Sequence, residues 1–490
     1  MKKKLLFLFS TALLFSTAHA LSSAEALPDT TTLLLSYVEN DSELKNLTLA
    51  AKKAALSYES AKIDTGFDVT LSSGTITLRT SDDGNTLTAK PSVKASLPQA
   101  SNLSVTAQTN YTSDSSDSAT DDSKLSDTSV SVGVDIISSS VISNKLTKLK
   151  AERNVLEAQR KIEKRAIAAE KEFYTELKSL LTTINSIMTK RQTLYEDSID
   201  LEAKKVQGYS KASSTYRQAE LKVISDQHEI ESAIHSFKHD CVVFYKKCGY
   251  DLELEIDDKT ELMGFVPSGI DEVEPADVTQ FEKEFYTEIE SANWTYYINS
   301  MERSSKKTFS ISASAGYTFD NSTTNSDSID AGLNGTIGGL TLGAGVSMPL
   351  GNADGSGSGS KASPAYTFSA TLTPNTFRKN SITKQQNELT EEQELLAIQT
   401  AEAAYETKVV ELQQKLDTLL WEKKTAGENI SMYDDLEKDM AKLYKQGYIS
   451  ETEYLSSKNN LNSSIIKKIS NLIDLIIYND DVVTNFVSTN

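Results

Sequence analysis

Side chains with the chemistry of a metal or catalytic site are few in this chain. His235 and His239 stand four residues apart, a spacing that places two imidazoles on one helix face and that metal sites use. Only Asp240 lies beside them, so a packing or surface role is favoured over a metal site. No Walker A glycine loop, no H-E-x-x-H zinc motif and no G-x-S-x-G nucleophile motif occurs. The sequence therefore predicts no enzyme, no cofactor and no bound metal.

Two glycines stand at equivalent places in the two halves of the chain. Gln207-Gly208-Tyr209 and Gln446-Gly447-Tyr448 each interrupt a long proline-free stretch with helical periodicity. Each glycine predicts the end of one helix, because glycine readily adopts the left-handed conformation of a helix C-cap. The order of segments around the two glycines is the same, which indicates an internal duplication.

The N-terminus and the net charge limit where this chain works and what it binds. The basic residues Lys2–Lys4, the apolar run Leu5–Phe15 and the small residues around Ala20 predict a signal peptide over residues 1–20. That run is too short for a transmembrane anchor. No later window holds 18 apolar residues, so only a closed β-barrel could satisfy the backbone inside a membrane. The formal net charge of −19 excludes nucleic-acid binding driven by phosphate neutralisation.

Hydrophobic periodicity divides the mature chain into two repeats, residues 21–250 and 277–490, joined by a linker over 251–276. Each repeat is predicted to contain a short helix, a strand zone and a long helical hairpin whose tip lies near the glycine. Alternation of period two predicts strands at Thr75–Leu78, Leu103–Ala107, Val130–Val134, Phe309–Ala315, Leu340–Val346 and Tyr366–Leu372. Heptad-like spacing predicts helix packing through Leu177, Leu181, Ile184, Met188, Tyr195, Val409, Leu412, Leu416 and Leu419.

The strand zones carry two predicted loops, Thr112–Asp127 and Gly351–Pro364, both rich in small or polar residues. Residues 67–98 hold more strand-like sequence than two strands per repeat require, which leaves either extra strands or a periplasmic β-extension open. Cys241 and Cys248 lie on one helix face, about 10 Å apart along its axis, too far for a disulfide unless the helix bends. Either two buried thiols or, with a bend near Gly249, a disulfide fits the sequence.

The segment Lys442–Leu455, with its Tyr444, Gly447, Ser450 and Glu453, resembles the hairpin tip of the TolC-like outer-membrane efflux proteins. The duplicated order extends this resemblance over nearly the whole mature chain. The resemblance implies an α+β membrane protein, a trimer whose protomers share one outer-membrane β-barrel continued by a long periplasmic tunnel of α-helical coiled coil. It also implies an outer-membrane location extending into the periplasm.

The resemblance further implies an exit duct of a tripartite efflux or type I secretion system, a passive channel for small molecules or exported proteins. Its partners would be a periplasmic adaptor protein, an inner-membrane pump coupled through that adaptor, and outer-membrane lipid. Adaptor docking is implied at the two tips, at Gly208, Tyr209, Ser210, Gly447, Tyr448, Ile449 and Ser450. Ile449 departs from the arginine that the family often has there.

A periplasmic constriction is implied at Tyr444 and Glu453. Glu453 of three chains would form an acidic ring that favours cations, or it is a solvated surface glutamate. Tyr444 either hydrogen-bonds across the closed tip or packs between helices. A surface or periplasmic coiled-coil structural protein, such as an adhesin stalk, is the alternative function. It would explain the heptads but not two strand zones at equivalent places.

Overall fold

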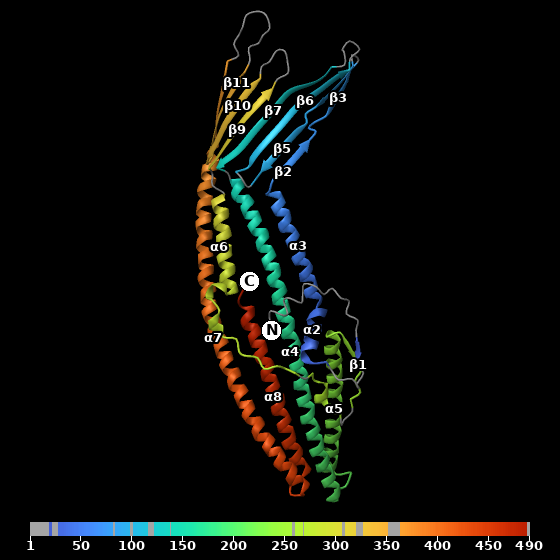
Figure 1. The fold of residues 1–490 in the computed structure, drawn as a ribbon. Helices are drawn as coiled ribbons and strands as arrows, with labels where there is room; N and C mark the ends of the chain where they lie inside the picture. The colour runs from blue at the N-terminus through green and yellow to red at the C-terminus, as the bar shows by residue number, and fades with distance from the viewer. Residues whose placement is uncertain are drawn as a thin grey trace, which may run out of the picture. The chain divides into compact units, whose positions relative to one another are not determined.

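The computed structural model describes residues 19–21, 28–81, 84–98, 101–115, 122–137, 139–256, 260–267, 269–305, 309–319, 327–350 and 363–487. These residues form an α+β fold of long helices and one large antiparallel sheet (Figure 1). The predicted signal peptide lies outside them except for its last two residues, which begin the short strand β1 (His19–Leu21). The predicted loop Gly351–Pro364 also lies outside them except for its last two residues.

The helices follow the predicted order closely. They are α2 (Thr30–Asn40), α3 (Ser42–Asp64), α4 (Ser139–Val206), α5 (Ser214–Lys247), α6 (Thr287–Ser305), α7 (Pro374–Lys445) and α8 (Glu451–Thr484). The first predicted helix is divided in two at Asp41, because Asp41 ends α2 and its carboxylate accepts a hydrogen bond from the Leu44 N–H at the start of α3 (2.7 Å).

The strands of the sheet are β2 (Asp68–Ser72), β3 (Thr77–Ser81), β4 (Gly84–Ala89), β5 (Ser92–Leu97), β6 (Leu103–Ser115), β7 (Asp122–Ile137), β9 (Phe309–Phe319), β10 (Ser328–Ile337), β11 (Leu340–Pro349) and β12 (Ala365–Leu372). Five of the six predicted strand segments are confirmed in full, and of the sixth, Thr75–Leu78, only Thr77 and Leu78 lie in a strand. The predicted loop Thr112–Asp127 is wrong over its described residues, because β6 and β7 continue into it and pair, with Tyr111 opposite Leu125. Its residues 116–121 lie outside the described residues. Ser, Thr and Asp at alternate positions of a strand can face solvent without interrupting the ladder.

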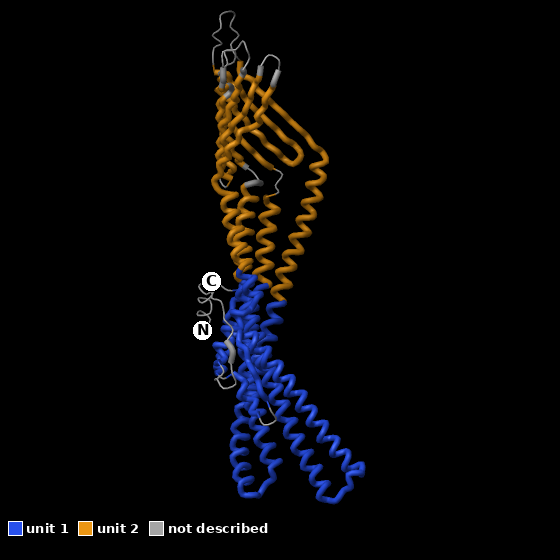
Figure 2. The backbone as a smooth tube through the Cα atoms, turned by 90° about the vertical axis from the view of Figure 1, so that its right-hand side faces the viewer, with its two compact units in different colours: residues 1–48, 160–287, 404–490 blue, residues 49–159, 288–403 orange. Residues whose placement is uncertain are grey.

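The chain forms two compact units (Figure 2). Unit 1 contains residues 1–48, 160–287 and 404–490, and unit 2 contains residues 49–159 and 288–403. Both helix hairpins, α4–α5 and α7–α8, have their tips in unit 1. Unit 2 contains the sheet.

The core of unit 1 is built where the predicted heptad seams meet. Leu177, Leu181 and Ile184 of α4 are fully buried. Phe173 lies at their N-terminal end, with the rings of Tyr174 and Phe244 at 5.3 and 5.2 Å between centroids. These apolar side chains are buried against α2, α5 and α8, and burial of this kind is the main favourable contribution to folding.

The predicted linker is part of this core. Leu252, Leu254 and Leu262 are buried in the same cluster, and the Tyr245 hydroxyl donates to the Phe265 carbonyl oxygen (3.2 Å). The short strand β8 (Tyr250–Leu252) pairs in parallel with β1. The prolines and acidic residues of segment 251–276 are typical of a linker between repeats, but they do not indicate that its leucines are buried.

Cys241 and Cys248 are both free and buried in this core. Burial raises the pKa of each thiol to about 12, so both are protonated and poorly reactive at neutral pH.

Within the described part of the chain, no helix has an apolar stretch long enough to cross a membrane.

The ten strands of the sheet occupy only eight positions across it. Ala89 of β4 is opposite Tyr111, and Ser92 of β5 is opposite Gln108, so β4 and β5 pair with β6 in one continuous register. The Thr109 N–H donates to the Pro91 carbonyl oxygen between them (3.1 Å). β2 and β3 likewise pair with β5 and β4, so they share the outermost position. Each repeat thus supplies four long strands, which confirms the extra strands that residues 67–98 left open.

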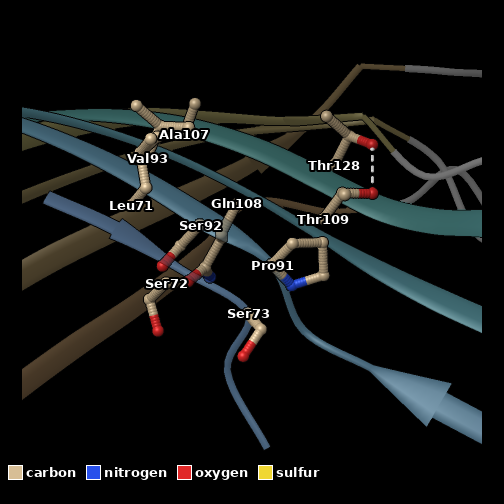
Figure 3. A pocket seen from close by; sticks show the side chains of 10 residues that line it. All are labelled: Leu71, Ser72, Ser73, Pro91, Ser92, Val93, Ala107, Gln108, Thr109 and Thr128. Atoms are coloured by element: carbon tan, nitrogen blue, oxygen red, sulfur yellow. Dashed lines mark hydrogen bonds between the residues drawn. The ribbon is translucent and has the colours of Figure 1, made fainter. Parts of the chain in front are cut away.

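The outermost strand position bends at Gly74, between β2 and β3, and the next position bends at Pro91, between β4 and β5. Pro91 has no N–H to donate to a ladder. Ser72 pairs with Ser92 and Thr77 pairs with Thr88, so the outer strand contains one residue more than its neighbour between these two pairs. The bend leaves a cavity of about 500 Å³ beside β2, β5, β6 and β7, where the Thr109 and Thr128 hydroxyls are hydrogen-bonded at 2.9 Å (Figure 3). Gly74 has a φ of 65°, and a Cβ there would lie 2.1 Å from the Lys90 carbonyl oxygen.

Gly74→Ala should therefore lower the free energy of unfolding by about 2 kcal/mol, because alanine is strained at positive φ and its methyl group meets the Lys90 backbone. The measurement is the temperature at which the purified full chain in detergent loses its β-sheet circular dichroism. Gly335→Ala in β10 is the matched control, since the nearest atom to its Cβ is 3.8 Å away. Equal melting temperatures for the two variants would contradict this account of the bend.

Candidate functional site

The two predicted glycine tips have the same backbone geometry. Gly208 and Gly447 have φ values of 78° and 75°. The Tyr209 N–H donates to the Lys204 carbonyl oxygen (3.1 Å), and the Tyr448 N–H donates to that of Leu443 (2.9 Å). These bonds, with those from the glycine N–H groups to carbonyls three residues earlier, make a Schellman motif at each tip. Both α4 and α7 therefore end in the same way, at a residue whose positive φ strongly favours glycine.

The surface at each tip is open. No atom lies within 4 Å of a Cβ built on Gly208 or Gly447. Tyr448 is 75% exposed and Tyr209 is 45% exposed. A tip that combines a bare backbone with an exposed aromatic ring can be approached closely by a partner, because nothing on the chain itself covers it.

The tips differ in how the second helix begins. In the first hairpin Ser210 lies inside a longer turn, and Ser213 caps α5 by accepting a hydrogen bond from the Tyr216 N–H (3.3 Å). In the second hairpin Ser450 itself caps α8, only three residues after Gly447. The residue that corresponds to Ser450 is thus Ser213, which is not among the predicted tip residues.

Glu453 is the third residue of α8 and completes a capping box with Ser450. Its carboxylate accepts from the Ser450 N–H and from the Ser450 hydroxyl, both at 2.8 Å, and the Ser450 Oγ accepts from the Glu453 N–H (3.3 Å). The hydrogen bonds from the Ser450 backbone and hydroxyl hold the pKa of Glu453 below its usual range. The side chain is exposed and ionised, so it can carry charge at the tip while it holds the start of the helix.

Tyr444 packs within its own hairpin. Its ring stacks on that of Tyr454 of α8, with centroids 5.1 Å apart and planes 4° from parallel. The Tyr454 hydroxyl donates to Glu437 of α7 (3.2 Å), so this pair fastens the two arms of the second hairpin together. Within one chain, Tyr444 therefore packs between the two helices of its hairpin.

A row of polar contacts joins the first hairpin to the second. The Tyr195 hydroxyl donates to Glu451 (2.5 Å), which raises the pKa of Tyr195 to about 12. Farther along, the Asn459 amide donates to Gln192 (2.8 Å). The Ser463 hydroxyl donates to Asn185 (2.6 Å). Tyr195 was predicted only as a seam residue, since nothing in the sequence shows which residue of a distant helix lies opposite.

The first hairpin carries its own charge cluster behind the tip. Lys222 of α5 donates to Asp197 of α4 (2.6 Å), and Asp197 lies beside Asp226. Burial and the neighbouring Asp197 raise the pKa of Asp226. Asp197 keeps a lowered pKa because Lys222 offsets the effect of burial. These residues hold α4 against α5 and are not among the predicted tip residues.

Comparison with known families follows the division into repeats. The TP096X N-terminal domain matches residues 33–270, and the TP096X C-terminal domain matches residues 271–489. The two domains of this one family, in order, cover nearly the whole chain. The chain belongs to the TP096X family. No curated protein sequence matches it.

Several solved structures are similar to this TP096X chain. A membrane protein from Pseudomonas aeruginosa is 14% identical, with 96% of this chain and 100% of that chain covered and a TM-score of 0.46. The outer membrane protein VceC from Vibrio cholerae is 12% identical over 93% and 96% of the two chains, with a TM-score of 0.44. The MtrE outer membrane channel of Neisseria gonorrhoeae is 12% identical over 97% and 95%, with a TM-score of 0.45. The predicted resemblance is confirmed as a likeness.

Ser450→Ala should loosen the first turn of α8, because it leaves the Glu453 N–H without its acceptor, at a cost of about 1 kcal/mol. Glu453→Gln is the matched variant, since glutamine also completes a capping box. Hydrogen exchange of the full chain, resolved to the first turn of α8, measures the difference. Exchange should accelerate in Ser450→Ala and change little in Glu453→Gln. Equal acceleration in both variants would show that the charge, and not the cap, holds the turn.

Proposed function

We propose that this protein is the outer-membrane exit duct of a tripartite efflux or type I secretion system. The observation that carries the proposal is the pairing of two kinds of structure in each repeat, a four-stranded segment of one sheet and a long helix hairpin with a glycine tip. A sheet that closes with other copies can cross a membrane. Helix hairpins with apolar seams can line a passage only when they pack side by side.

The duct is passive and homotrimeric in this proposal, and it lies in the outer membrane and extends into the periplasm. Energy and cargo selection come from an inner-membrane pump, coupled through a periplasmic adaptor protein. The adaptor docks on the tips, at Gly208, Tyr209, Ser210, Gly447, Tyr448, Ile449 and Ser450, which are open in the chain. Close approach of an adaptor backbone to the glycines explains why no side chain occupies either site.

The second hairpin supplies the constriction in this proposal. Glu453 stays ionised, and three copies around an axis would place three carboxylates at the narrow end and favour cations there. Tyr444 stiffens the same hairpin through its stack on Tyr454. Opening of the duct would separate the hairpins and break the Tyr195–Glu451 hydrogen bond.

A coiled-coil stalk is the weaker candidate. It would use the helix seams, but it has no use for a sheet to which both repeats contribute equally. The sheet also explains the many apolar side chains that β2, β7 and β12 expose, because a lipid-facing band requires them.

Gly447→Trp should abolish export, because an indole at the tip blocks the approach of an adaptor and touches nothing in the core. Gly447→Ala is the matched control, since alanine is also strained at positive φ but adds little bulk. The measurement is retention of a fluorescent export substrate by cells that lack the wild-type gene and carry each variant. Retention with tryptophan and export with alanine, at equal abundance of the two proteins, is the expected result. Normal export by Gly447→Trp would contradict docking at this tip.

A further inference from the structure

The sheet contains one junction between the two repeats. β7 is the last strand of the first repeat and β9 is the first strand of the second, and they pair antiparallel. Val130 is opposite Tyr317 and Val134 is opposite Ala313. The fourth strand of one repeat therefore joins the first strand of the next.

The same two kinds of strand form the outer edges of the sheet. β12 is the fourth strand of the second repeat, and within the described residues it pairs only with β11. β2 is part of the first strand of the first repeat, and it pairs only with β5 in that part of the chain. The edges left open are thus the counterparts of the strands that meet at the internal junction.

The β12 edge lacks the features that normally keep sheet edges apart, and β2 carries one charged residue, Asp68, and no proline. β12 contains no charged residue and no proline, and its side chains are exposed along its whole length, with Phe368 81% exposed. β2 exposes Leu71, which is 75% accessible. Edge strands that stay unpaired are usually protected by lysine, proline or a covering element. These two are suited to pairing.

The direction of the chain permits that pairing to be antiparallel. β2 begins four residues after the end of α3, and β9 begins four residues after the end of α6. β12 ends two residues before α7, and β7 ends two residues before α4. Both edge strands therefore have their helix-connected ends on the same side of the sheet and run in opposite directions, as β7 and β9 do.

These offsets transfer the register of the internal junction to the open edges. Val134 lies five residues before α4, as Ser369 lies five residues before α7. Ala313 lies eight residues after α6, as Ser72 lies eight residues after α3. Since Val134 is opposite Ala313, the repeat symmetry places Ser369 opposite Ser72.

We propose that β12 of one chain pairs antiparallel with β2 of a second copy, with Ser369 opposite Ser72, so that each copy adds eight strand positions to a closed ring. This inference rests on the proposed function and specifies the number of strands in the barrel. Three copies would make a ring of about 24 strands, where two strands per repeat would give half that number. A ring of this size is wider than the 16–18-stranded barrels that leave an aqueous channel.

The test joins the two edges with thiols. Ser72→Cys and Ser369→Cys are combined in the full chain, and a reagent with two thiol-reactive groups about 5 Å apart is added, to match the Cβ separation of opposite residues. The native Cys241 and Cys248 are buried and do not compete. Leu71→Cys with Ser369→Cys is the matched control, because Leu71 faces the other side of the sheet. Val134→Cys with Ala313→Cys reports the same geometry within one chain.

The expected result is a denaturing-gel ladder that stops at three chains for Ser72→Cys with Ser369→Cys, and no ladder for the Leu71 control. A cross-linked single chain without a ladder would overturn the inference, because β12 would then close on its own β2. If native mass spectrometry finds a trimer but no cross-link forms, the pairing of β12 with β2 is overturned and the proposed function stands. A single chain in native mass spectrometry, with no ladder, would overturn both.

Discussion

The constraint on which the rest of this structure depends is that every backbone N–H and C=O group of the sheet must find a partner. Within the described part of one chain the ladders are continuous from β12 across to β2 and β3, and pairing ends there. A sheet with two open edges is not a finished structure, since exposed edges recruit further strands. A protein built in this way depends on its neighbours for closure, and in a membrane no unpaired edge is tolerated.

Because the chain is duplicated, both the sheet and the two tips are built from the same structural unit used twice. Each repeat contains four strand positions and one hairpin, and both hairpins turn through the same glycine motif. The second helices begin differently, because Ser450 and Glu453 form a capping box whereas the position equivalent to Glu453 is the buried Tyr216. The second tip thus carries a charge that the first lacks. This difference allows the two hairpins to have distinct roles in one passage.

The sequence predicts the order of elements well because periodicity and glycine act locally. The break at Gly208 and five of the six predicted strand segments required no knowledge of distant residues. The sequence does not predict features that depend on tertiary contacts. Leu252 and Leu262 are buried although their segment has the composition of a linker, and β6 and β7 extend through Ser- and Asp-rich sequence because they pair with each other. The Tyr195–Glu451 contact joins residues too far apart for any local pattern to indicate.

The central claim, that the outer edge of β12 is paired in the assembled protein, is tested most directly by amide hydrogen exchange. Alternate N–H groups of an antiparallel strand point to opposite neighbours, so β11 alone can protect only every second amide of β12. Exchange resolved to single residues over Tyr366–Leu372, in the detergent-solubilised full chain, should show uniform protection comparable with that of the interior strand β10. Fast exchange at every second residue would show an unpaired edge and would contradict the account.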